Sequence, residues 1–200
     1  MKEHLTLQML RQIDFSKVYP FHMLDGRVVE DRRSPIPQGP HIIDHTVRDA
    51  SSAETVPESE QDVLLIEESI HYYLSADKRK RFNMPTYVMN PITAREHLTS
   101  CIFRGSEGDL EPGSFSGRQI GEETYVDKWR MEAPGFQFRM LTLDGNVVLL
   151  IRLLGSPFDR RVHKREDYRF TDEEALWAEE FAIQTLKGFA RQGYTRVTQP

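Results

Sequence analysis

The chain has 200 residues, of which 38% are hydrophobic and 28% are charged, and its formal net charge is −5. This length and apolar content suit one domain with an appended segment, or at most two small domains, because a chain of this size buries a sizeable core. The mildly acidic balance argues against a nucleic-acid or anionic-membrane surface over the whole molecule, so we expect no nucleic acid partner.

Two features of the sequence bear on cellular location. No apolar run approaches the roughly 18 to 20 residues that a membrane span needs, so we expect no membrane span. The amino-terminal stretch MKEHLTLQML is interrupted by polar residues and lacks the apolar core of a secretory signal. The sequence as given therefore indicates a cytoplasmic protein, or an extracytoplasmic one from which a signal segment was removed.

The single cysteine, Cys101, excludes an internal disulfide framework, and we expect it to be a small buried residue on a helix.

The first third of the chain shows little regular periodicity. Residues 3–12 have the spacing of a short helix, and LDGRVV at Leu24–Val29 has the chemistry of a tight hairpin turn. From residue 30 to residue 61 prolines stand among Ser, Glu, Asp and Arg, which is typical of extended connecting chain. We therefore divide the chain into an N-terminal extension with a linker, residues 1–61, and a main domain, residues 62–200.

The first half of the main domain alternates strand and helix signals. VLLIEESIHYYL, residues 63–74, is rich in β-branched and aromatic residues and predicts a strand. Residues 76–82 predict at most two helical turns before Pro85. Asn90 at the cap and Pro91 at the first helical position predict a helix over 91–102. A Gly- and Ser-rich loop over 104–121 and a strand over 123–129 follow.

A β-hairpin over Phe136–Leu153 is the clearest structural signal in the chain. Its two apolar strands meet at Asp144-Gly145-Asn146, where Gly accepts the positive φ of a tight turn. One face must be buried, and it carries Phe136, Phe138, Met140, Thr142, Val147, Leu149, Ile151 and Leu153. The other face carries Leu141, Leu143, Val148 and Leu150 near the turn. This second face is either covered by a helix or the first sixty residues, and then is scaffold, or open, and then is a face for a partner or ligand.

The final helix is predicted over 172–191. Thr171 and Glu174 form a capping box at its start, and Gly193 is placed to end it. Its apolar stripe provides the cover that the hairpin needs. The predicted fold is therefore α+β: an antiparallel sheet of 63–74, 123–129, 136–143 and 147–153, covered by the two helices 91–102 and 172–191.

Three segments in this order resemble a known group of proteins. They are GRQIGEETY at 117–125, LDGNVVLLIRL at 143–153 and TDEEALWAEEFAIQTL at 171–186. Together they resemble small extracytoplasmic bacterial domains of unknown function, many of which are lipoproteins or the outer sensor parts of membrane proteins. The resemblance covers about residues 62–192. It implies an α+β sheet with packed helices and a binding or sensing role, and it transfers no catalytic residue.

One cluster has the residue types of a metal site. His41 and His45 are four residues apart, with Asp44 between them, which is the spacing that places two imidazoles on one side of a helix. Pro40 precedes the cluster and the surroundings are linker-like, so the alternative is a set of polar loop residues. Glu67, Glu68, Glu122 and Glu123 include neighbouring carboxylates of the kind used in glycoside hydrolysis, with solvated strand ends as the alternative.

Two basic runs stand out in the acidic chain. The first is Lys78, Arg79, Lys80 and Arg81, and the second includes Arg160, Arg161, Lys164 and Arg165. They form an anion-binding patch if they meet on one face, and solvated surface if they do not.

We rank three functions on this evidence. The first is a non-enzymatic binding, sensor or accessory domain, which needs no cofactor. The second is a small metal-dependent hydrolase that uses His41, Asp44 and His45. The third is a structural protein that associates with itself as a homodimer, or with another protein, through a free sheet edge or its amino-terminal segment.

Overall fold

The computed structural model describes residues 1–24, 27–31, 46–49, 66–73, 80–104, 110–127, 137–155 and 170–196. Its helices are α1 (Leu7–Arg11), the 3-10 helix η1 (Phe15–Lys17), α2 (Pro91–Arg104) and α3 (Asp172–Ala190). Its strands are β1 (Phe21–Leu24), β2 (Arg27–Asp31), β3 (Thr46–Asp49), β4 (Ile66–Tyr73), β5 (Lys80–Val88), β6 (Glu111–Pro112), β7 (Glu123–Asp127), β8 (Gln137–Asp144) and β9 (Val147–Gly155).

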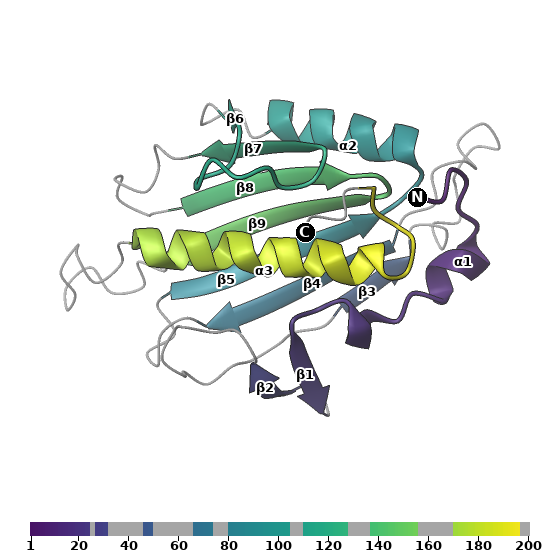
Figure 1. The fold of residues 1–200 in the computed structure, drawn as a ribbon, viewed down its shortest axis with the longest axis horizontal. Helices are drawn as coiled ribbons and strands as arrows, with labels where there is room; N and C mark the ends of the chain where they lie inside the picture. Colours follow the sequence, from purple (N-terminus) through teal and green to yellow (C-terminus); the bar gives the residue numbers. More distant parts are fainter. Residues whose placement is uncertain are drawn as a thin grey trace.

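A seven-stranded antiparallel sheet forms the body of the protein. Its strand order is β3-β4-β5-β9-β8-β7-β6, and β1 pairs with β2 in a separate two-stranded sheet (Figure 1). The predicted hairpin is β8 and β9, which lie in the middle of the sheet with Asp144 opposite Val147. Gly145 in the two-residue turn has φ of 60°, as the turn chemistry requires. The predicted α+β class and the central position of the hairpin are confirmed.

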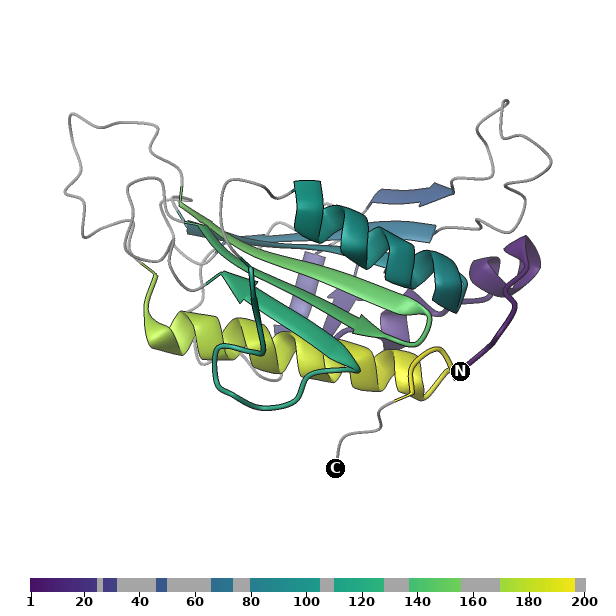
Figure 2. The same ribbon diagram turned by 90° about the horizontal axis from the view of Figure 1, so that it is seen from above.

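The two long helices cover opposite faces of the sheet (Figure 2). The face that carries Phe138, Met140, Leu149, Ile151 and Leu153 is fully buried in one core cluster with α3, as the alternation predicts. Thr171 and Glu174 make the predicted capping box at the start of α3. Phe181 packs edge-on against Phe82, with ring centroids 5.0 Å apart, so α3 also anchors β5.

Helix α2 covers the second face of the hairpin. Leu141, Leu143 and Val148 are buried in a cluster with Ala94 and Leu98 of α2. Leu150 is half-buried at the edge of the same cluster. Of the two alternatives for this face, the structure therefore has the covered one. These four residues belong to the core under α2 and do not form an open surface, although Leu143 also lines a pocket beside the hairpin turn.

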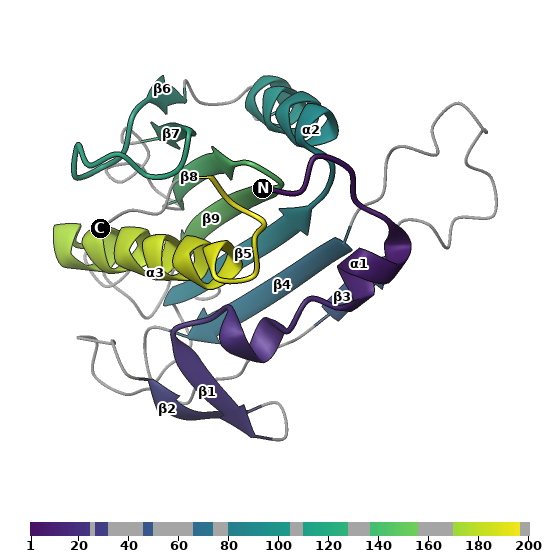
Figure 3. The ribbon, with the colours of Figure 1, turned by 45° about the vertical axis from the view of Figure 1, so that its right-hand side comes forward.

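The N-terminal segment is part of the main core. Leu5, Leu10, Ile13, Val18 and Tyr19 are buried in the same cluster as α3 and the sheet. Figure 3 shows this segment, drawn in purple, passing through α1 and η1 beside β3 and β4. A Cβ at Gly188 of α3 would lie 2.1 Å from the carbonyl oxygen of Val18, so glycine is what allows this close approach.

Strand β5 differs from the prediction. The sequence predicts helical turns over 76–82, but Lys80, Arg81 and Phe82 open a nine-residue strand. The sheet tolerates Pro85 inside this strand because the register of β5 with β9 records no pairs at Met84 and Pro85. Around the proline, Met84 and Val88 are buried in the core under α3, and Tyr87 packs against the core under α2.

Two further strands lie where the sequence predicts connecting chain. Strand β3 falls within residues 30–61 and pairs with β4, while β6 falls within 104–121 and pairs with β7. Both are edge strands of four and two residues, too short to show a period. None of the helices in the described ranges is long and apolar enough to cross a membrane.

Candidate functional site

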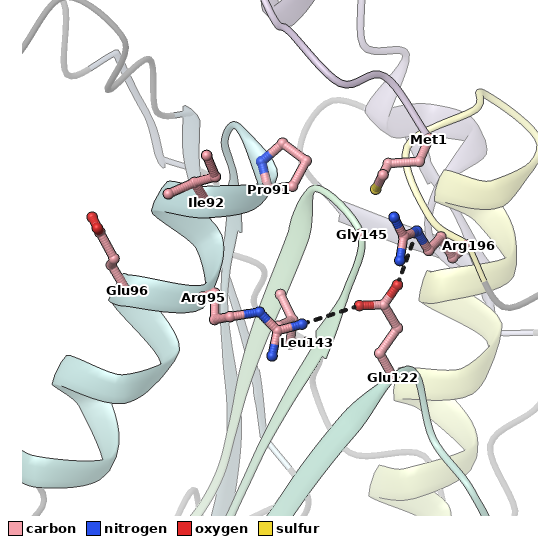
Figure 4. A pocket seen from close by; sticks show the side chains of 9 residues that line it. All are labelled: Met1, Pro91, Ile92, Arg95, Glu96, Glu122, Leu143, Gly145 and Arg196. Atoms are coloured by element: carbon pink, nitrogen blue, oxygen red, sulfur yellow. Dashed lines mark ion pairs between the residues drawn. The ribbon is translucent and has the colours of Figure 1, made fainter.

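A pocket of about 410 Å³ opens beside the turn of the central hairpin, and we refer to it as the turn pocket (Figure 4). It brings together the first turns of α2, the hairpin turn, the residue before β7 and both ends of the described chain. Its lining residues are Met1, Pro91, Ile92, Arg95, Glu96, Glu122, Leu143, Gly145 and Arg196. The pocket therefore depends on segments that are far apart in the sequence.

Asn146 holds these segments together. Its side-chain amide donates to the carbonyl oxygens of Lys2 at 2.8 Å and Met89 at 3.0 Å, and its Oδ1 accepts from the Lys2 amide at 3.1 Å. Its backbone N–H donates to the carbonyl of Tyr194 at 3.0 Å, and its own carbonyl accepts from the Met89 amide at 2.9 Å. Asn146 is fully buried, so these bonds satisfy a polar group that would otherwise be costly to bury.

Two neighbouring side chains extend this connection. Asn90, which precedes α2, accepts the backbone N–H of Leu5 through Oδ1 at 2.5 Å. Asp144 accepts the backbone N–H of Arg196 at 2.8 Å. In the tight turn, a Cβ at Gly145 would lie 3.2 Å from Met1 Cγ and 3.0 Å from the Tyr194 carbonyl oxygen. The floor of the turn pocket is thus close-packed and held by hydrogen bonds on every side.

A chain of ion pairs crosses the pocket from α2 to the C-terminal segment. Glu122 lies 3.6 Å from an Nη of Arg95 and 3.2 Å from Nε of Arg196, and Arg95 also pairs with Glu123. Figure 4 shows Arg95 and Arg196 approaching Glu122 from opposite sides. The two arginine side chains are 56% and 60% exposed, whereas that of Glu122 is 18% exposed. A mostly buried carboxylate therefore positions two guanidinium groups that remain accessible from solvent.

The guanidinium of Arg196 keeps donors for a further partner. The ion pair joins Nε of Arg196 to Oε1 of Glu122, and Oε1 accepts no hydrogen bond. The two terminal nitrogens of Arg196 donate no hydrogen bond to any described residue. In Figure 4 the carboxylate of Glu96 points away from both arginines, so it does not compete for these donors. Met1, Ile92 and Leu143 supply apolar walls beside them.

A second, smaller pocket of about 270 Å³ lies over the loop between β6 and β7. Glu179 of α3 fixes this loop, because its buried carboxylate accepts the backbone N–H groups of Phe115 and Ser116. Next to it, Glu180 pairs with Arg118 at 3.2 Å. Burial acts to raise the pKa of Glu180, but hydrogen bonds from Gln184 and Arg118 outweigh it and lower the pKa. This pocket lacks the converging arginines of the turn pocket.

The remaining candidates for chemistry on the described residues are few. Cys101 is half-buried on α2, and its Sγ lies 3.5 Å from Nε2 of His97, whose ring packs on Tyr87. Partial burial and the nearby Glu123 carboxylate raise the pKa of the Tyr125 hydroxyl. No group of three or more His, Cys, Asp or Glu side chains in the described ranges is arranged to hold a metal ion.

The described residues include some of the predicted site residues and not others. The predicted metal cluster His41, Asp44 and His45 lies outside the described residues, as do Lys78, Arg79, Arg160, Arg161, Lys164 and Arg165. Lys80 and Arg81 open β5, and Lys80 lies opposite Gly155 at the end of β9. The start of β5 and the end of β9 therefore lie at the same end of the sheet. Of the four glutamates considered for catalysis, Glu122 and Glu123 are ion-paired with Arg95.

Sequence reasoning did not single out Arg95, Arg196 or Asn146. Arg95 carries a recognisable signal, since it lies one turn after the Asn90-Pro91 helix start and is exposed there. Arg196 carries none, because it lies beyond the end of α3 and reaches Glu122 only in the folded chain. Comparison with family models, curated proteins and solved structures gave no match. The geometry alone must therefore support a function.

Proposed function

We propose that this protein is a non-enzymatic ligand-binding domain, and that the turn pocket binds a small molecule bearing a carboxylate on an apolar body. The observation that carries the proposal is Arg196, whose Nε is held by Glu122 while its terminal nitrogens face the pocket. A guanidinium in this position offers two parallel N–H donors to a carboxylate. The resemblance to extracytoplasmic sensor domains supports the same functional class.

The apolar part of the ligand follows from the other walls. Ile92 is 78% exposed at the pocket mouth, and a side chain of this size gains from being covered. Leu143 lies at the base of the pocket and Met1 lines another wall. A ligand with an acidic head and a branched aliphatic body matches these contacts.

N-acetyl-leucine and N-acetyl-leucinamide form a matched pair of probes, since they differ only in the charge of the head group. We expect the acid to shift the amide NMR signals of Ile92, Leu143 and Gly145 and to bind at least about tenfold more tightly than the amide. Arg196→Met should remove this preference. Arg191→Met changes an exposed arginine outside the pocket and should retain it. Equal binding of the two probes, or shifts confined to other residues, would contradict the proposal.

A further inference from the structure

A row of polar side chains crosses four strands at the end of the sheet opposite the hairpin turn. The register places Asn83 of β5 beside Arg152 of β9, Arg152 beside Arg139 of β8, and Arg139 beside Asp127 of β7. We refer to these four residues as the arginine row. Arg139 and Arg152 are each two residues from Leu141 and Leu150, so the row lies on the face of the sheet that carries α2.

The arginine row holds more positive than negative charge. An Nη of Arg139 lies 2.9 Å from Oδ2 of Asp127, with side chains 13% and 1% exposed. None of the described carboxylates pairs with Arg152 in this way. Its Nε is buried without a hydrogen-bond partner, and it makes no ion pair with any described residue. Two like charges opposite each other on neighbouring strands repel, and a partly buried unpaired guanidinium is costly.

By sequence, the segments that connect these strands are also basic. Strands β4, β7 and β9 end at this end of the sheet, and β5 and β8 begin there. The pairs Tyr73 with Arg81, Lys80 with Gly155 and Asp127 with Arg139 show this. By sequence, residues 74–79 and 128–136 each contain two basic and one acidic residue, and residues 156–169 contain five basic and three acidic residues. Each of the three segments is net positive in a chain whose net charge is −5.

We infer that the arginine row binds a small oxyanion of the phosphate class, with Arg152 as its principal ligand. The guanidinium of Arg152 supplies the charge and a fork of N–H donors that match phosphate oxygens. The side-chain amide of Asn83 stands beside it in the row, and Arg139 reinforces the local potential while it remains tied to Asp127. The bound anion neutralises the repulsion between the two arginines. This site is separate from the turn pocket and does not depend on it.

Inorganic phosphate is the probe for this site. We expect the melting temperature of the full chain to rise with phosphate and to saturate, compared with sodium chloride at the same ionic strength, which separates binding from screening. Titration calorimetry should show one site. Arg152→Met should weaken phosphate binding at least tenfold, and Arg152→Lys, which keeps the charge but loses the fork, should retain part of it.

Two controls make the result decisive. Arg191→Met and Arg196→Met should both keep the phosphate response, because neither residue belongs to the arginine row. Circular dichroism of Arg152→Met should match the wild type, because replacing an unpaired, partly buried charge with an apolar side chain of similar length preserves the fold. The inference is overturned if the wild type responds to phosphate no more than to chloride, or if Arg152→Met responds as the wild type does.

Discussion

At the scale of single residues, Asn146 has the most connections around the turn pocket. We expect Asn146→Ala to lower the free energy of unfolding by about 2 to 4 kcal/mol, because it leaves the Lys2 amide and the carbonyls of Lys2 and Met89 without their partner. Urea unfolding followed by circular dichroism measures this change. Gln8→Ala replaces an exposed polar residue on α1 and should stay within about 0.5 kcal/mol of the wild type. A loss for Asn146→Ala no larger than that of the control would contradict its role.

The residues around the hairpin turn show which parts of the site can be predicted from the sequence and which cannot. The Asp144-Gly145-Asn146 string identifies a tight turn because turn chemistry is local. The partners of Asn146 are not local, since Lys2 is 144 positions away and Met89 is 57 positions away. Buried polar groups such as the Asn146 side chain meet partners from distant parts of the sequence only when the chain folds. The hairpin was therefore predictable, and the pocket beside it was not.

At the scale of elements, α3 carries most of the cover on one face of the sheet. We expect Phe181→Ala to cost about 3 to 5 kcal/mol, since this side chain is 4% exposed and contacts the rings of Phe82 and Trp177. Leu176→Ala is the matched control on the same helix, because Leu176 is 42% exposed. It should cost less than about 1 kcal/mol in the same denaturant experiment. Similar losses for the two variants would show that α3 does not pack as described.

Elements with a strong periodic pattern or a capped end were predictable. The hairpin strands alternate clearly, α2 begins at Asn90-Pro91, and α3 has its capping box, so each carries its own signal. The local sequence of strand β5 is misleading, since a basic run followed by a proline is more typical of a helix end than of an interior strand. Its conformation is decided by β4 and β9 on either side, which is a property of the sheet and not of the local sequence.

At the scale of the whole molecule, the first residues complete the core that the later ones begin. A fragment of residues 62–200 lacks Leu5, Leu10 and Val18, each of which is at most 1% exposed in the full chain. We expect its urea midpoint to lie well below that of the full chain, because losing several buried aliphatic side chains removes a large part of a typical domain's stability. A synthetic peptide of residues 1–24 should raise the midpoint when added in excess. Equal midpoints for fragment and full chain would show that the N-terminal segment is dispensable.

The meeting of both chain ends on one hairpin turn also has a mechanical consequence. Lys2 bonds to the side chain of Asn146, and Tyr194 bonds to its backbone N–H. Tension applied between Lys2 and Tyr194 would therefore act on the hydrogen bonds of Asn146 before it acted on the hydrogen bonds between the strands. Under a pulling force, the hydrogen bonds of Asn146 would break first, while β5, β9 and β8 remain paired.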